Sequence, residues 1–79
     1  MPSSEDLKRR IEAAIPGAEA DVDGPDGVHF SAVVTAPAFA GRSRLEQHRM
    51  VMDVFAGELG GAIHALSIKT RVPSPQEHA

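Results

Sequence analysis

The fold is decided by one strand-like stretch near the end of the chain, Ile63-His64-Ala65-Leu66-Ser67-Ile68-Lys69-Thr70-Arg71. Apolar and polar residues alternate through most of it, which is the pattern of a strand with one covered face. The alternation predicts two sets of side chains: His64, Leu66, Ile68 and Thr70 toward the core, and Ala65, Ser67, Lys69 and Arg71 toward solvent. One histidine is therefore expected at the rim of the core, where an imidazole can hydrogen-bond, titrate near neutral pH or bind a metal.

Before this strand the sequence predicts one helix and two further strands. Ser3 or Ser4 can cap a helix whose apolar residues recur at helical spacing and which ends at Pro16. Residues 18–23 are weakly strand-like, and residues 28–35, rich in β-branched side chains, carry the strongest strand signal in the chain. The loop between them is short and rich in turn residues, so we expect these two strands to be antiparallel.

A second helix is predicted between these strands and the last one. Ser43 and Glu46 have the Ser-x-x-Glu spacing of a capping box, and the helix is expected to run to about Leu59. Met50 and Val54 are expected on its outer side, either as a ridge for a partner or as isolated surface residues. The opposite stripe is expected to pack on the sheet and contains Leu45, His48, Met52, Phe55, Ala56 and Leu59.

The order helix, strand, strand, helix, strand predicts a single α+β domain over residues 1–79. A helical crossover makes the third strand parallel to the second, which gives a three-stranded mixed sheet with both helices on one face. The ordered part is expected over about residues 3–73, and the proline-broken residues 74–79 are expected to form a flexible tail.

Composition excludes several classes of function. The chain has no cysteine, which excludes disulfides, cysteine zinc sites and thiol catalysis. A formal net charge of −3 argues against a dedicated nucleic-acid binder. No stretch approaches the roughly 20 apolar residues of a membrane span, and no signal peptide begins the chain, so we expect a cytoplasmic protein with no membrane partner. No Ser-His-Asp order, paired-carboxylate cleft or phosphate loop stands out, so we do not expect an enzyme.

Four segments resemble, in order and spacing, the signatures of the BolA family: Val28-His29-Phe30, Phe39-Ala40-Gly41-Arg42-Ser43, Gln47-His48-Arg49-Met50-Val51 and Ile63-His64-Ala65-Leu66-Ser67-Ile68. The resemblance covers nearly the whole chain and is closest to compact bacterial BolA-like proteins. It implies a class II KH-like fold. It also implies a non-enzymatic accessory protein that pairs with a monothiol, CGFS-type glutaredoxin.

In that family the two proteins, together with glutathione, hold a bridging 2Fe-2S cluster for iron–sulphur cluster assembly, trafficking or iron sensing. The resemblance therefore implies a shared cluster and no cofactor in the isolated protein. Some bacterial members are described as DNA-binding regulators of stress response and morphology. A KH-like binder of DNA or RNA is accordingly the alternative function, and a homodimer of the apo protein is also left open.

The resemblance assigns the near-constant cluster ligand to His64. The second family ligand is usually a Cys or His in the loop between the first two strands, but residues 18–28 contain neither. His29 is the nearest substitute, although it matches a different family position. Strand parity places His29 on the open face and His64 on the helix side, so a shared metal would need an irregularity at one strand start. A histidine at a strand end can equally be a hydrogen-bonded structural residue.

The remaining candidates are cationic or histidine side chains. His48 is expected to be structural, packed under the sheet or near Phe39, and His78 to have no role. Gly57-Glu58-Leu59-Gly60 fits the Gly-x-x-Gly motif of KH nucleic-acid-binding loops. Its two central residues are acidic and apolar, whereas contact with phosphate favours basic residues. Five basic residues can form a patch for an acidic partner, glutathione carboxylates or phosphates, or be ordinary solvated surface: Arg42, Arg44, Arg49, Lys69 and Arg71.

Overall fold

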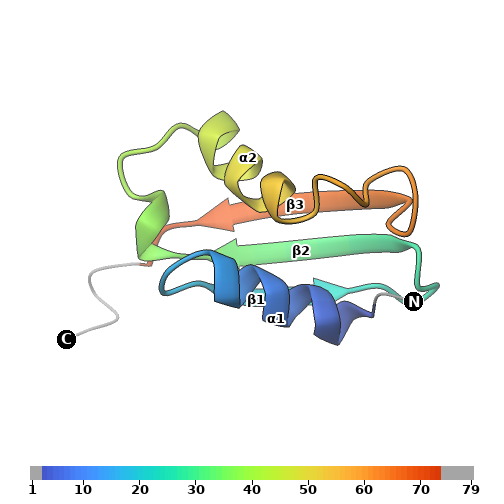
Figure 1. Cartoon of the computed structure of the whole chain (residues 1–79). Coiled ribbons are helices and arrows are strands. Elements are labelled where there is room, and N and C mark those ends of the chain that lie inside the picture. The colour runs from blue at the N-terminus through green and yellow to red at the C-terminus, as the bar shows by residue number, and fades with distance from the viewer. Residues whose placement is uncertain (1–2, 74–79) are drawn as a thin grey trace.

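The computed structural model describes residues 3–73, so the predicted tail over 74–79, with His78, lies outside the described residues. The elements follow the predicted order (Figure 1). They are α1 (Ser4–Ala14), β1 (Glu19–Asp23), β2 (His29–Thr35), the short 3-10 helix η1 (Pro37–Phe39), α2 (Arg44–Val54) and β3 (Ala65–Arg71). Among the described residues, no helix is long and apolar enough to cross a membrane.

The three strands form one sheet in the order β1-β2-β3. β1 pairs with β2 in antiparallel orientation, and β2 pairs with β3 in parallel orientation with His29 opposite Ala65. Figure 1 shows α1 and α2 on the same side of the sheet. The predicted α+β architecture with a mixed sheet is therefore confirmed, and the parallel pair makes β2 and β3 begin at the same end of the molecule.

Both helices begin at serine caps. Ser3 Oγ accepts a hydrogen bond from the Asp6 amide at 3.1 Å, which satisfies a free donor of the first turn of α1. Ser43 Oγ accepts from the Glu46 amide at 3.1 Å, while Glu46 Oε1 accepts from the Ser43 amide at 2.9 Å. The predicted capping box of α2 is thus confirmed, and its backbone bond holds the pKa of Glu46 below its ordinary value.

The second helix ends at Val54, earlier than the predicted Leu59. At its end the Phe55 amide donates to the Met52 carbonyl, a tightened bond from residue i to i−3. The Glu58 carbonyl then accepts from the amides of Gly61 and Ile63 at 3.1 and 3.0 Å. This folded loop, residues 55–64, leads directly into β3.

Only part of the predicted stripe packs on the core, where Phe55 is buried and Leu59 contacts the cluster as expected. Leu45 was expected to be buried but is 67% exposed, whereas Met50 and Val54 pack against the core. Gln47 fixes this rotation, because its Nε2 donates to the Arg42 carbonyl at 2.9 Å and its Oε1 accepts from Thr70 at 2.5 Å. The core lies between the helices and the covered sheet face and contains Leu7, Ile11, Ile15, Ala20, Phe30, Ala32, Val34, Ala36, Phe39, Val51, Phe55 and Ile63.

A side chain of α1 covers part of the outer edge of β1. Glu12 Oε2 accepts a hydrogen bond from the Ala20 backbone amide at 3.0 Å and another from Lys8 Nζ at 2.7 Å. Edge strands offer unpaired backbone groups to other chains, and charged side chains at the edge discourage such pairing. Glu12 therefore both anchors α1 and occupies a donor that an incoming strand would need.

Candidate functional site

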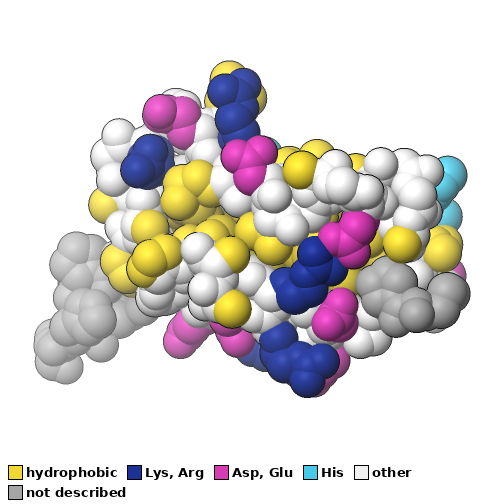
Figure 2. Space-filling model, viewed as in Figure 1, with side chains coloured by type: hydrophobic (Ala, Val, Ile, Leu, Met, Phe, Trp, Pro, Cys, Tyr) yellow, Lys and Arg dark blue, Asp and Glu magenta, His cyan; other side chains and the backbone are white. Residues whose placement is uncertain are grey.

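Two histidines lie side by side at the end of the sheet where β2 and β3 begin. His29 is the first residue of β2, and His64 immediately precedes β3. Their ring centroids are 4.9 Å apart, with an angle of 73° between the planes. Both side chains are exposed, and Figure 2 shows histidine at this end of the molecular surface. The structure thus brings together the two predicted metal-ligand candidates.

A local irregularity at the start of β3 makes this pairing possible. The amides of His64 and Ala65 both donate to the Val28 carbonyl, at 3.0 and 3.3 Å. Two successive amides therefore share one acceptor just before the regular pairing of β2 and β3 begins at His29 and Ala65. Ile63 is buried and His64 is exposed, so the prediction that His64 faces the core is wrong. The predicted orientation of β3 itself is confirmed, since Leu66, Ile68 and Thr70 are half-buried and the alternate residues are exposed.

The loop before β2 holds His29 through one carboxylate. Asp26 Oδ1 accepts from the backbone amides of Val28 and His29 at 3.0 and 2.8 Å. Asp26 Oδ2 lies 2.6 Å from His29 Nδ1. The two hydrogen bonds from backbone amides, and to a smaller extent the contact with the His29 ring, hold the pKa of Asp26 well below its ordinary value. Sequence reasoning missed this residue, although an Asp followed by Gly in a tight loop is typical of a side chain that bonds the backbone two residues on.

The loop that carries His64 is tied to α1. Both guanidinium Nη atoms of Arg10 donate to the carboxylate of Glu58, with Nη1 at 2.8 Å from Oε1. The Arg10 guanidinium carbon also lies 4.8 Å from the centre of the Phe55 ring. The bond from Arg10 holds the pKa of Glu58 below its ordinary value. A cation and a carboxylate far apart in sequence leave no periodic signal, so this contact was not predicted.

The spacing of the histidine pair suits two ligands of one metal. Two imidazoles bound at about 2.0–2.1 Å in tetrahedral geometry have ring centres roughly 5 Å apart, close to the observed separation. No group of three or more metal-ligand side chains exists among residues 3–73, and the whole chain has no cysteine. The pair could therefore fill only part of the coordination sphere of a metal.

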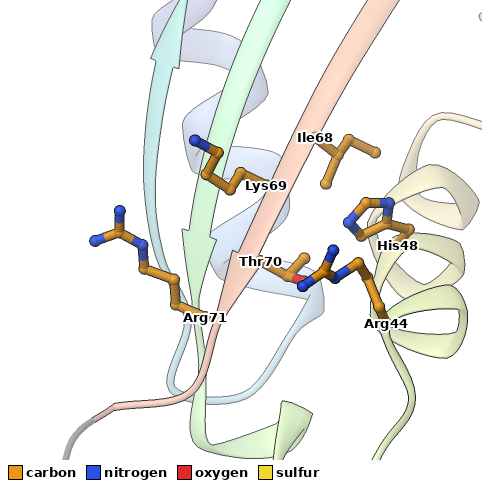
Figure 3. Close-up of a pocket in the computed structure, with 6 residues that line it drawn as sticks. All are labelled: Arg44, His48, Ile68, Lys69, Thr70 and Arg71. Carbon is orange, nitrogen blue, oxygen red and sulfur yellow. The ribbon is translucent and has the colours of Figure 1, made fainter.

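The predicted basic residues lie elsewhere. Arg44, Lys69 and Arg71 line a groove of about 350 Å³ between α2 and β3, together with His48, Ile68 and Thr70. Figure 3 shows Arg44 and His48 on the α2 side of β3, while Lys69 and Arg71 extend on the other side.

The remaining two arginines do not line this groove. Arg42 donates through Nε to the Ala38 carbonyl at 3.2 Å, and Arg49 is exposed on α2. His48 is half-buried and lines the groove on the helix side of β3. The cationic side chains thus divide between the two faces of β3, at its far end from His64.

Comparison with known proteins identifies the family. Residues 10–75 match the family described as BolA-like protein. Human BolA-like protein 1 is 46% identical over 46 residues, which cover 58% of this chain and 34% of that protein, so the matched segment spans about a third of the longer relative. A BolA homologue from Coxiella burnetii has a TM-score of 0.79 and 37% identity, covering 99% of this chain and 97% of the other.

A second solved structure is the BolA domain of SufE1 from Arabidopsis thaliana, with a TM-score of 0.75 and 28% identity over 89% of this chain and 91% of that domain. The likeness to these structures agrees with the two helices and mixed sheet described above. Because the family match covers most of the sequence, this chain belongs to the BolA-like protein family.

Proposed function

We propose that this chain is a non-enzymatic accessory protein that binds a monothiol, CGFS-type glutaredoxin and supplies histidine ligands to a 2Fe-2S cluster shared between the two proteins. Its role would lie in iron–sulphur cluster assembly, trafficking or iron homeostasis. The observation that carries the proposal is the exposed pair of His29 and His64, with ring centroids 4.9 Å apart. The similarity to the BolA domain of a SufE protein also favours a role in iron–sulphur metabolism.

An incomplete ligand set favours a shared site. The described part of the chain offers two imidazoles at this point and no third ligand, and thiolates are absent from the sequence. Iron–sulphur clusters are usually held by four ligands, mostly thiolates. A partner that contributes thiolates would complete the set, with glutathione as the second source that the family resemblance implies.

The histidines would also affect the chemistry of such a cluster. Replacing thiolate by imidazole lowers the negative charge of the site and raises its reduction potential. An imidazole must be neutral to bind a metal, so ligation by histidine makes binding dependent on pH. The exposure of both rings lets a partner approach them without unfolding the core.

The predicted basic residues do not lie at the histidine pair. Lys69 and Arg71 lie about 13 to 20 Å along β3 from its first residue, since a strand rises about 3.3 Å per residue. Their backbone positions are therefore well separated from the histidine pair. Arg44 and Arg49 remain candidates for contact with an acidic surface of the partner, because both are exposed on α2.

The test is to mix the purified chain with a 2Fe-2S-loaded monothiol glutaredoxin. We expect a 1:1 heterocomplex by native mass spectrometry and a changed visible absorption and circular dichroism spectrum. An unchanged spectrum together with the absence of a heterocomplex would contradict the proposal. The His48→Ala variant is the matched control, since His48 lies at the groove between α2 and β3 and not at the pair.

A further inference from the structure

We propose that Asp26 is a positioning residue that fixes the His29 imidazole as the tautomer with its proton on Nδ1, so that Nε2 is the metal-binding atom. The inference rests on the proposed function, because it assigns a role to His29 as a ligand. It extends that function by naming the group that prepares the ligand before any metal arrives.

The two oxygens of the Asp26 carboxylate have different hydrogen-bond partners. Oδ1 accepts hydrogen bonds from the backbone amides of Val28 and His29 and so stabilises the turn into β2. Oδ2 is left for the imidazole and lies 2.6 Å from Nδ1. An ionised carboxylate can only accept hydrogen bonds, so the ring nitrogen facing it must be the donor. The other nitrogen of a neutral ring then carries the free electron pair.

This arrangement matches the way proteins prepare metal-binding histidines. Such a histidine usually donates its second ring N–H to a carboxylate or carbonyl, which sets the tautomer and ring orientation and increases the basicity of the ligating nitrogen. His64 has no such partner among the side-chain hydrogen bonds of the described residues. Of the two rings, His29 is therefore the one held in a defined orientation, and it presents a fixed edge beside His64.

A purely structural role for Asp26 would involve the turn alone, and one substitution distinguishes the two roles. In Asp26→Asn the side-chain oxygen can still accept from Val28 and His29, so the turn is retained. The amide nitrogen would then face Nδ1 and donate to it, which places the ring proton on Nε2 and blocks ligation there. Asp26→Ala removes the hydrogen bonds to the backbone amides as well as the contact with the His29 ring. Asp23→Asn is the control for the loss of one negative charge in the same region.

The first measurement needs no partner. Long-range 1H–15N correlation spectra of the apo protein, recorded at about pH 8 where ordinary imidazoles are neutral, report the tautomer of each histidine. We expect the Nδ1–H tautomer for His29 in the wild type and in Asp23→Asn, and the Nε2–H tautomer in Asp26→Asn. The same His29 tautomer in wild type and Asp26→Asn would overturn the inference.

The second measurement uses Zn²⁺ as the probe of the isolated chain. We expect Zn²⁺ to perturb the His29 ring signals with an affinity about 10 to 100 times higher in the wild type than in Asp26→Asn. Equal behaviour of the two proteins, including no perturbation in either, would contradict the role of Asp26 in ligation. A failed glutaredoxin mixture would remove the proposed function and leave the tautomer result standing, so the two failures are distinguishable.

Discussion

Arg10 of α1 and Glu58 of the loop before β3 form an ion pair with two parallel hydrogen bonds, across 48 residues of sequence. The same loop carries His64, and its turns are organised by the Glu58 carbonyl, which accepts from the Gly61 and Ile63 amides. The position of one candidate metal ligand therefore depends on the first helix. Paired bonds between a guanidinium and a carboxylate fix orientation as well as distance.

Arg10→Ala should loosen the loop of residues 55–64 and leave the rest of the fold intact. We expect faster amide hydrogen exchange at Gly61, Ile63 and His64. In the variant the loop can open without breaking the ion pair between Arg10 and Glu58, so opening costs less free energy. Arg9→Ala is the control, since the Arg9 side chain is 71% exposed and pairs with Asp6 of its own helix. Unchanged exchange at these three amides would show that the loop is held by its backbone bonds alone.

His64→Ala should weaken the cluster proposed to be shared with a glutaredoxin. With the glutaredoxin heterocomplex, we expect faster cluster loss for His64→Ala and for His29→Ala, measured as decay of visible absorbance. His48→Ala should behave as the wild type, because that ring lies at the groove between α2 and β3. Equal decay in all three variants would argue that neither ring of the pair is a ligand.

Gly24→Ala should destabilise the protein through the core. A Cβ at Gly24 would lie 2.5 Å from Cε1 of Phe30, whose ring is 2% exposed and cannot move freely. We expect a loss of about 1–3 kcal/mol in the free energy of unfolding, the usual cost of overpacking. Gly57→Ala, where the added carbon meets nothing within 4 Å, should change stability by less than about 0.5 kcal/mol. Urea unfolding of the two variants checks the difference.

Stability should fall as pH decreases into the acidic range. The bond from Arg10 lowers the pKa of Glu58, and the bonds from Lys8 and the Ala20 amide lower the pKa of Glu12. A carboxyl whose pKa is lower in the folded state binds a proton more readily in the unfolded chain, so its contribution is full above the unfolded pKa, about 4.3, and is lost below it. Urea unfolding between about pH 7 and 3 should show the decline, with a shallower slope in Glu58→Gln.

Nucleic acid should bind weakly if at all. Arg44 extends from the α2 side of β3 and Lys69 and Arg71 from the other side, and the chain carries a formal net charge of −3, which disfavours binding to a phosphate backbone. Fluorescence anisotropy with duplex and single-stranded DNA at low salt tests this expectation. Salt-dependent binding that is lost in Arg42→Ala, Arg44→Ala or Lys69→Ala would favour the regulator alternative instead.

Local signals in the sequence were sufficient to predict the order of the elements and the directions of the strands. The serine caps, the hairpin loop and the crossover length gave the element order and strand directions, because each depends on residues close together in the chain. The side-chain alternation in β3 was also predictable, since neighbouring strands enforce it. The end of α2 was not, because the chain tightens at Phe55, whose amide bonds the Met52 carbonyl, several residues before the glycines.

The geometry of the site was harder to predict from the sequence. α2 carries apolar residues on more than one side, and tertiary bonds from Gln47 select the side that is buried. A period of two cannot detect the point where His64 and Ala65 share one acceptor, so it placed His64 on the wrong side. Asp26 and Arg10 act through contacts with a few particular residues, which leave no repeating pattern in the sequence.

The bond between Glu12 and the Ala20 amide also limits how copies of this chain can associate. Growth of a filament by strand addition needs two open edges on every subunit, one for each neighbour. Here β1 has a donor already occupied, and among the described residues β3 is the edge that no α1 side chain bonds in this way. Addition of a strand at β1 would have to displace Glu12 from the Ala20 amide, whereas addition at β3 would meet no such side chain.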